Sequence, residues 1–198
     1  MTNQRVIILY SGGVDSTLLA LEALAQNKRV TLLHFRYDHP AKMAEYTASN
    51  RIYDHLRLDY PNLEYISIEL PIMASSMFIG EGKQGARVVA NRNAIMLNMA
   101  INICVDRNIK VIQYGAVLDD DAEYVDCRPE FLDKMNAIAS DWGVEIQAPY
   151  MKRTKAEIMK DMYVPLYIQE NWSSCYQPTM NSGWWVKCGS CSSCLSNQ

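Results

Sequence analysis

Apolar and polar positions in the first seventy residues fall into short apolar runs separated by longer amphipathic stretches. Residues 6–10 and 29–35 are nearly continuous apolar runs, as expected for strands covered on both faces of a sheet. Residues 16–27 and 43–58 carry apolar side chains at helical spacing and predict two helices. Residues 63–70 alternate in polarity, which predicts a strand at the edge of the sheet. This order predicts an open, mainly parallel sheet with right-handed crossovers.

The second half of the chain continues the alternation of strands and helices. The pattern predicts strands over 110–114 and 145–148 and helices over 92–108, 129–142 and 155–162. The side chains expected to face the core are Ile95, Met99 and Ile103 in the first of these helices, and Phe131, Met135, Ile138 and Trp142 in the second. The predicted fold class is therefore α/β, with a five-stranded parallel sheet and helices on both of its faces.

Domain organisation follows from the end of this alternation. We expect an α/β domain over residues 1–165 and a small C-terminal extension over 166–198, packed on the same domain. The irregular stretch 71–90, which is rich in glycine and serine, is interpreted either as a lid that faces the substrate or as a plain surface loop.

Composition narrows the class of protein. The 198 residues are 49% hydrophobic, which is enough for one domain with a sizeable core. The net charge of −3 does not indicate an electrostatic grip on nucleic acid. No apolar run reaches the ~18 residues of a membrane span, and the N-terminus does not resemble a signal peptide. We therefore expect a cytoplasmic protein with no membrane partner.

The first predicted strand leads into a candidate phosphate-binding turn. A glycine-bearing turn before a helix directs several backbone N–H groups at one point, where the helix dipole favours an anion. Asp15 would repel a bare phosphate, so its presence favours a nucleotide bound together with Mg²⁺. The alternative is an ordinary helix cap, because Ser and Asp are frequent capping residues. The residues predicted to bind the nucleotide are Ser11, Gly12, Gly13, Val14, Asp15, Ser16 and Thr17, together with Gly115 at the end of the fourth strand.

An acidic run, Asp119-Asp120-Asp121-Ala122-Glu123, follows the fourth strand. Such a run is usually a solvated loop. Its place beyond the carboxyl end of a strand, where ligands bind in parallel sheets, makes the handling of Mg²⁺ or ammonium an open alternative.

Four of the six cysteines lie in the C-terminal extension and predict a metal site. The spacing in Cys188-Gly-Ser-Cys191-Ser-Ser-Cys194 lets one turn direct three thiols inward, and Cys175 completes a set of four. We expect structural Zn²⁺ that pins the extension against the active-site face, with an iron–sulfur cluster or free thiols as alternatives.

Four blocks of sequence together resemble the 7-cyano-7-deazaguanine synthase family of the PP-loop ATP pyrophosphatase superfamily. The blocks are Ser11-Gly-Gly-Val-Asp-Ser16, Arg92-Asn-Ala-Ile95, Asp126-Cys-Arg-Pro-Glu-Phe131, and Ser174-Cys-Tyr176 with the three-cysteine tail; Thr154-Lys-Ala-Glu-Ile158 is a weaker fifth match. The resemblance implies an ATP-dependent carbon–nitrogen ligase of queuosine biosynthesis. Such an enzyme adenylates the carboxylate of 7-carboxy-7-deazaguanine and converts it with ammonia, through the amide, to the nitrile. It also implies a homodimer.

Candidate roles follow for individual residues. We expect Asp15, Ser16, Arg92 and Lys155 to be catalytic, with Arg92 binding phosphate or carboxylate as a bidentate donor. A surface arginine and a solvent-exposed lysine are the alternatives for the last two. The residues expected to line the deazaguanine end are Arg92, Asp121, Asp126, Cys127, Arg128 and Glu130, although Cys127 is equally well explained as a buried structural thiol.

The chain departs from the family pattern on the presumed acceptor side. Members usually have proline at position 125, Pro-Gly or Pro-Ala at 89–90, Tyr-Gly-Gln near 37–39, and an arginine soon after the last cysteine. These departures motivate one alternative, the transfer of the same acyl-adenylate to another amine on a protein or a modified nucleotide. Two further alternatives stay open: a sensor that binds ATP without turnover, and another PP-loop enzyme such as a tRNA-thiolating one.

Overall fold

The structure, a computed structural model, describes residues 4–72, 77–78, 87–89, 91–120 and 124–195. Five parallel strands form one open sheet in the order β3-β2-β1-β6-β7. This confirms the predicted fold class and the edge position of the third strand. The strands are β1 (Arg5–Leu9), β2 (Arg29–Arg36), β3 (Glu64–Glu69), β6 (Val111–Gln113) and β7 (Glu145–Gln147).

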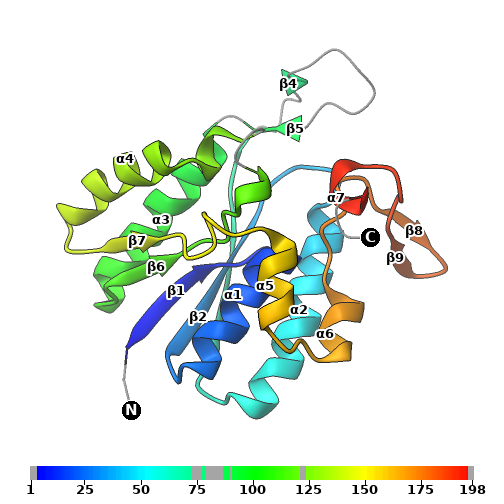
Figure 1. The fold of residues 1–198 in the computed structure, drawn as a ribbon, viewed down its shortest axis with the longest axis horizontal. Helices are drawn as coiled ribbons and strands as arrows, with labels where there is room; N and C mark the ends of the chain where they lie inside the picture. The colour runs from blue at the N-terminus through cyan, green and yellow to red at the C-terminus, as the bar shows by residue number, and fades with distance from the viewer. Residues whose placement is uncertain (1–3, 73–76, 79–86, 90, 121–123, 196–198) are drawn as a thin grey trace.

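Helices cover both faces of the sheet (Figure 1). One face packs against α3 (Arg92–Arg107) and α4 (Pro129–Ser140). The other packs against α1 (Val14–Ala25), α2 (Lys42–Asp59), α5 (Lys155–Asp161) and α6 (Leu166–Asn171). Successive strand residues serve opposite cores, since Ile7 belongs to the first cluster and Ile8 to the second. The continuous apolar runs of the central strands are therefore buried on both sides.

Two predicted helix faces were wrong in part, although Ile103, Phe131 and Met135 do pack against the core as predicted. In α3, Ile95 and Met99 are each 36% exposed, because the helix turns a different stripe, with Leu97 and Ile101 at its centre, toward the sheet. In α4, Ile138 is 45% exposed, and Trp142, predicted to continue this helix, lies beyond its last residue and is 61% exposed. This helix packs at the end of the sheet against β7 and α3, so only a narrow stripe around Met135 and Ala139 is buried.

Several short elements were not predicted. Within the stretch expected to be irregular, β4 (Met77–Phe78) pairs antiparallel with β5 (Arg87–Val88), while the other residues of 73–90 that would form a lid lie largely outside the described part. Two 3-10 turns, η1 (Leu118–Asp120) and η2 (Val125–Cys127), precede α4. The extension adds the hairpin of β8 (Thr179–Asn181) and β9 (Trp184–Val186) and the short helix α7 (Ser192–Leu195). None of the described helices is both long and apolar enough to cross a membrane.

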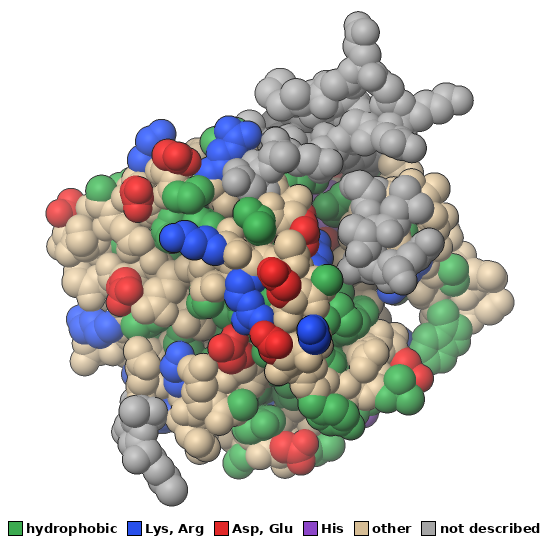
Figure 2. Space-filling model, viewed as in Figure 1, with side chains coloured by type: hydrophobic (Ala, Val, Ile, Leu, Met, Phe, Trp, Pro, Cys, Tyr) green, Lys and Arg blue, Asp and Glu red, His purple; other side chains and the backbone are tan. Residues whose placement is uncertain are grey.

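Beyond α6, the extension lies at the carboxyl ends of the strands, with α7 and the hairpin near the start of α2 (Figure 1). Its first helix, α6, packs on α2 and contributes Ile168 to the core of the sheet domain. The division at residue 165 stays an interpretation. On the face seen in Figure 2, acidic and basic side chains are interspersed.

Candidate active site

A four-residue turn joins β1 to α1 and carries the predicted phosphate-binding residues. Gly13 N donates to Ser11 Oγ at 3.1 Å, and Ser16 Oγ donates to Gly13 O at 3.3 Å. The two serine hydroxyls lie 3.1 Å apart, so they hold the turn closed. No side chain in the described part of the chain caps α1, which argues against the simple capping interpretation.

Gly12 is held from two sides by segments that are distant in sequence. Its φ is +80°, and a Cβ atom there would lie 2.6 Å from Ser49 N in α2. Ser173 N, from the C-terminal extension, donates to Gly12 O at 2.9 Å. Only glycine fits this turn, because the conformation is left-handed and the neighbouring backbone is in contact.

Asp15 and Lys155 form a charged pair beside this turn. Lys155 Nζ lies 3.4 Å from Asp15 Oδ2 and 3.8 Å from Asp120 Oδ1. Burial raises the pKa of Asp15 to about 6, although the Lys155 ammonium acts to lower it. Asp15 Oδ1 is buried without a hydrogen-bond partner among the described residues. An unpartnered carboxylate oxygen beside a phosphate-binding turn fits a Mg²⁺ ligand.

Asp119 in the acidic run has a structural role, because its Oδ2 accepts a hydrogen bond of 2.7 Å from Lys155 N at the start of α5. Asp120 instead lines two cavities at the carboxyl ends of the strands. Asp121, predicted to bind substrate, lies outside the described residues together with positions 122 and 123.

Two adjoining cavities open at the carboxyl ends of the strands. Their volumes are about 220 and 240 Å³, each below the roughly 300–1,000 Å³ of a typical ligand pocket. They are one crevice, because seven residues line both: Tyr37, Glu45, Arg92, Asn93, Gly115, Asp120 and Tyr176. We call the cavity lined by the β1–α1 turn and Lys155 the nucleotide half, and the cavity lined by His39, Val89 and Asp126 the acceptor half.

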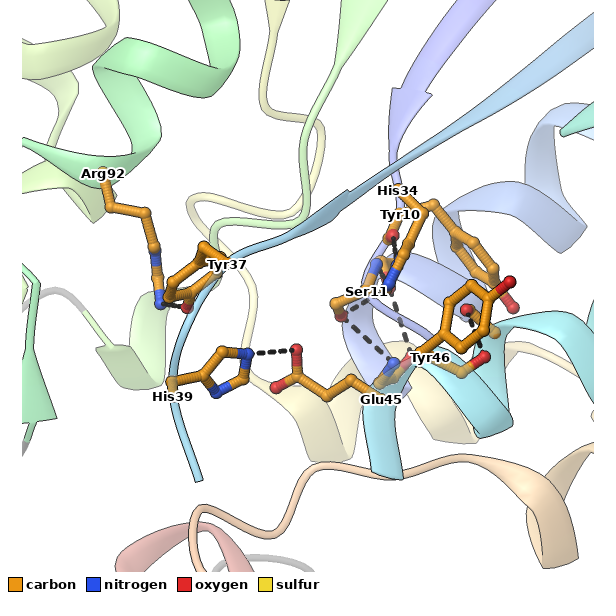
Figure 3. Close-up of polar contacts among 11 residues, drawn as sticks. Tyr10, Ser11, His34, Tyr37, His39, Glu45, Tyr46 and Arg92 are labelled. Atoms are coloured by element: carbon orange, nitrogen blue, oxygen red, sulfur yellow. Dashed lines mark hydrogen bonds and ion pairs between the residues drawn. The ribbon is translucent and has the colours of Figure 1, made fainter. Parts of the chain in front are cut away.

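A row of polar side chains crosses the junction of the two halves (Figure 3). Arg92 Nη1 donates to Tyr37 Oη at 2.9 Å, and His39 Nε2 lies 3.5 Å from Glu45 Oε2. Burial raises the pKa of Glu45 to about 7 and, with the nearby Arg92 guanidinium, lowers the pKa of His39 to about 4. His39 is therefore neutral at pH 7, whereas Glu45 is present in both protonation states.

The four cysteines of the extension come together as predicted. The Sγ atoms of Cys175, Cys188, Cys191 and Cys194 all lie within 4.8 Å of one another. Cys188 N also donates to Cys175 Sγ at 3.2 Å. Four converging thiols suit a tetrahedral ion such as Zn²⁺ and leave no coordination position for a substrate.

Comparison with known proteins supports one family. The chain matches the profile of the "Queuosine biosynthesis protein QueC" family over residues 5–198. The chain belongs to this family. It is 31% identical to the 7-cyano-7-deazaguanine synthase of Pseudoalteromonas translucida (strain TAC 125), covering 96% of this chain and 90% of that protein. It is also 31% identical to the synthase of Methanospirillum hungatei JF-1, covering 96% and 91%.

Solved structures support the fold. A predicted subunit of tRNA methyltransferase from Methanocaldococcus jannaschii aligns with a TM-score of 0.58 at 14% identity, covering 79% of this chain and 73% of that one. The U34-tRNA thiolase NcsA from Methanococcus maripaludis, determined with its [4Fe-4S] cluster, aligns with a TM-score of 0.55 at 13% identity, covering 91% and 63%. At these identities the likeness concerns the fold of this QueC family member and not its chemistry.

Some of the residues predicted from sequence line the crevice of this QueC family member, and others do not. Asp126 and Cys127 line the acceptor half, whereas Arg128 and Glu130 line neither cavity. Burial raises the pKa of the Cys127 thiol to about 12, so it stays neutral. Thr17 is fully buried behind the turn, in contrast to Ser16, which lines the nucleotide half.

Sequence reasoning missed the aromatic and acidic residues that wall the crevice of this QueC member. Glu45 and Tyr176 line both halves, and Tyr124 lines the acceptor half with its Oη 3.4 Å from Tyr176 Oη. The available signal for Glu45 was its position shortly after the second strand, and for Tyr176 its position next to the predicted metal ligand Cys175. His34, by contrast, is buried behind the turn and its Nδ1–H donates to Tyr10 O at 2.9 Å (Figure 3).

Proposed function

We propose that this chain is an ATP-dependent 7-cyano-7-deazaguanine synthase that adenylates the carboxylate of 7-carboxy-7-deazaguanine. The observation that carries the proposal is the single crevice, which joins a phosphate-binding turn to a walled cavity through Arg92. A carboxylate in the acceptor half then meets the α-phosphate of ATP at the junction. Its oxygen attacks the α-phosphorus, pyrophosphate leaves, and the poor leaving group becomes AMP.

The remaining steps consume ammonia. Ammonia attacks the acyl carbon and expels AMP, which gives the amide. Activation of the amide oxygen by a second ATP and loss of that oxygen give the nitrile. Every step needs water kept away from the activated carbon, and the walls formed by Tyr37, Tyr124 and Tyr176 serve that purpose.

Each half of the crevice has a defined task in this proposal. The backbone N–H groups of residues 11–16 hold the phosphates, and Lys155 adds a positive charge beside them. Mg²⁺ held by Asp15 would neutralise phosphate charge when it is bound. Arg92 binds the substrate carboxylate, since its guanidinium is fixed by Tyr37 and faces the junction. Asp126 pairs with the amino and ring N–H edge of the deazaguanine.

The four-cysteine cluster holds Zn²⁺ in a structural role. Four thiolates close the coordination sphere and fix the extension that contacts Gly12. Metal analysis of the purified protein tests the ion: one zinc per chain and no visible absorption are expected, whereas iron with a charge-transfer band would indicate a cluster.

An amine other than ammonia is a second candidate acceptor of the acyl group, because two departures from the family pattern lie on the wall of the acceptor half. His39 and Val89 line this cavity at positions where members usually have glutamine and proline. An amine other than ammonia, on a protein or a modified nucleotide, would meet this altered wall.

Product analysis separates these functions. The purified chain is incubated with ATP, 7-carboxy-7-deazaguanine and ammonium, and the products are read by mass spectrometry. The expected product is 7-cyano-7-deazaguanine. An adenylate that is captured only by a different amine would support the second acceptor, and the absence of any nucleotide product would indicate a sensor.

A further inference from the structure

Glu45 occupies the junction of the crevice although no reaction step described so far uses it. It lies in the first turn of α2 and lines both cavities, where the acyl carbon and the leaving AMP would meet. Its side chain is still 23% exposed and faces the open crevice. A carboxylate here repels the carboxylate and phosphates of the substrates, so its presence suggests a function that requires a negative charge at the junction.

The surroundings of Glu45 leave its negative charge available to a cation. His39, 3.5 Å away, stays neutral because its pKa is about 4. Arg92 acts on Glu45 across the cavity but points at the Tyr37 hydroxyl (Figure 3). A small cation can therefore sit between the Glu45 carboxylate and the aromatic walls, where cation–π attraction adds to the charge.

The other acidic groups facing the crevice are less suited. Asp15 and Asp120 both lie within 4 Å of Lys155 Nζ, which compensates their charge. Asp126 lines only the acceptor half, away from the phosphate-binding turn. Glu45 is therefore the acidic side chain of the described crevice that touches both halves and has no lysine beside it.

The chemistry at this point needs a base. Ammonium is the dominant form of the nitrogen donor at neutral pH, and it has no lone pair with which to attack the acyl carbon. We propose that Glu45 binds ammonium at the junction and accepts one proton from it, so that ammonia forms beside the adenylate; this inference rests on the proposed function.

The bonds balance without a further reactant. One N–H bond of ammonium breaks and an O–H bond forms on the Glu45 carboxylate. The nitrogen lone pair then forms the C–N bond as the C–O bond to AMP breaks. The nitrogen loses a second proton to solvent, and Glu45 releases its own proton when the crevice opens to water. A carboxyl group whose pKa is about 7 can take up and release a proton near neutral pH.

Replacing the nitrogen donor tests the role of Glu45. Hydroxylamine is mostly neutral near pH 7.5, so it captures the adenylate as a hydroxamate without a base. Glu45→Gln should lower the ammonium-dependent rate at pH 7 about 10²-fold, while hydroxamate formation stays within about twofold of the unmodified chain. Glu170→Gln, an exposed substitution on α6, is the matched control and should change neither rate.

Two outcomes of this comparison would contradict the role of Glu45 in amine capture. Equal loss of both rates would mean that Glu45 serves adenylation or folding, and retention of both would mean that it has no role in amine capture; either result overturns the inference. Failure of the unmodified chain to form any adenylate would instead overturn the proposed function.

The pH profile of the unmodified chain gives a second readout that does not depend on a folded variant. At fixed total ammonium, a rate that levels off above about pH 7, as Glu45 becomes fully ionised, supports the inference. A rate that keeps rising in proportion to free ammonia would overturn it.

Discussion

Replacing Gly12 with alanine tests the geometry of the nucleotide turn directly. Gly12 has a φ of +80°, and the added Cβ would lie 2.6 Å from Ser49 N and 2.9 Å from Ser49 Cα. Both atoms are backbone atoms of a helix residue that is fully buried. They cannot move aside as a flexible side chain could, so either the turn or α2 must shift.

The cost has two parts that can be separated. A non-glycine residue in a left-handed conformation costs about 1–2 kcal/mol. Forcing an atom into a packed region adds about 1–3 kcal/mol. Gly143→Ala is a matched control, because Gly143 has a φ of +65° but its added Cβ would meet only Lys110 Nζ, at 3.9 Å. Gly12→Ala should therefore lower the free energy of unfolding by about 1–3 kcal/mol more than the control.

Urea unfolding of the two variants and the unmodified chain measures this difference. In a chain of this size each kcal/mol corresponds to about 2–4 °C in Tm, so thermal unfolding provides a check. Gly12→Ala should also lose ATP binding, measured by calorimetry, while Gly143→Ala keeps it. Equal destabilisation of the two variants with ATP binding intact would refute the tight approach of the turn to α2.

Three further outcomes are expected. The pKa of Asp15 is about 6 before any metal binds, so protons compete with Mg²⁺ for its carboxylate. The Mg²⁺ concentration needed for half-maximal exchange of pyrophosphate into ATP should therefore rise as the pH falls through 6. Lys155→Met, which removes the cation that lowers this pKa, should move the midpoint of that pH dependence upward, and an unmoved midpoint would contradict the pairing. Arg92→Lys keeps the charge but loses the bidentate donor, so the KM for the carboxylate should rise about tenfold with little change in Tm. An unchanged KM would mean that Arg92 does not contact the substrate. Cys191→Ser should lose bound zinc in metal analysis whereas Cys104→Ser keeps it, and equal zinc contents would exclude the four-cysteine site.

The sheet was predictable because its signal is local and redundant. Nearly continuous apolar runs such as 29–35, set between helical stretches, favour central strands, and β2 is buried along nearly its whole length. The helix faces were less predictable. Whether Ile95 or Leu97 in α3 meets the sheet depends on how the helix is rotated against it, and an apolar-rich helix offers more than one acceptable stripe.

The same contrast holds for the site. The nucleotide turn and the three-cysteine tail each lie within fewer than ten consecutive residues, so the spacing of their residues predicts their geometry. The acceptor half is assembled from separate segments, with Glu45 from α2, Arg92 from α3 and Tyr176 from the extension. No periodicity links these positions, and they meet only because the helices and the extension converge at the carboxyl ends of the strands.

The extension connects the predicted metal site to both halves of the crevice. Ser173 N holds the Gly12 carbonyl, Cys175 lies two residues later in the metal cluster, and Tyr176 walls the junction where the two halves meet. The hairpin between Cys175 and Cys188 buries little, since Trp184 is 61% exposed, so apolar packing does not hold this segment in place. An ion shared by the four thiols would supply the missing constraint. Such an ion would fix residues 173–176 without touching substrate, and through them the nucleotide turn and the acceptor wall would share one support.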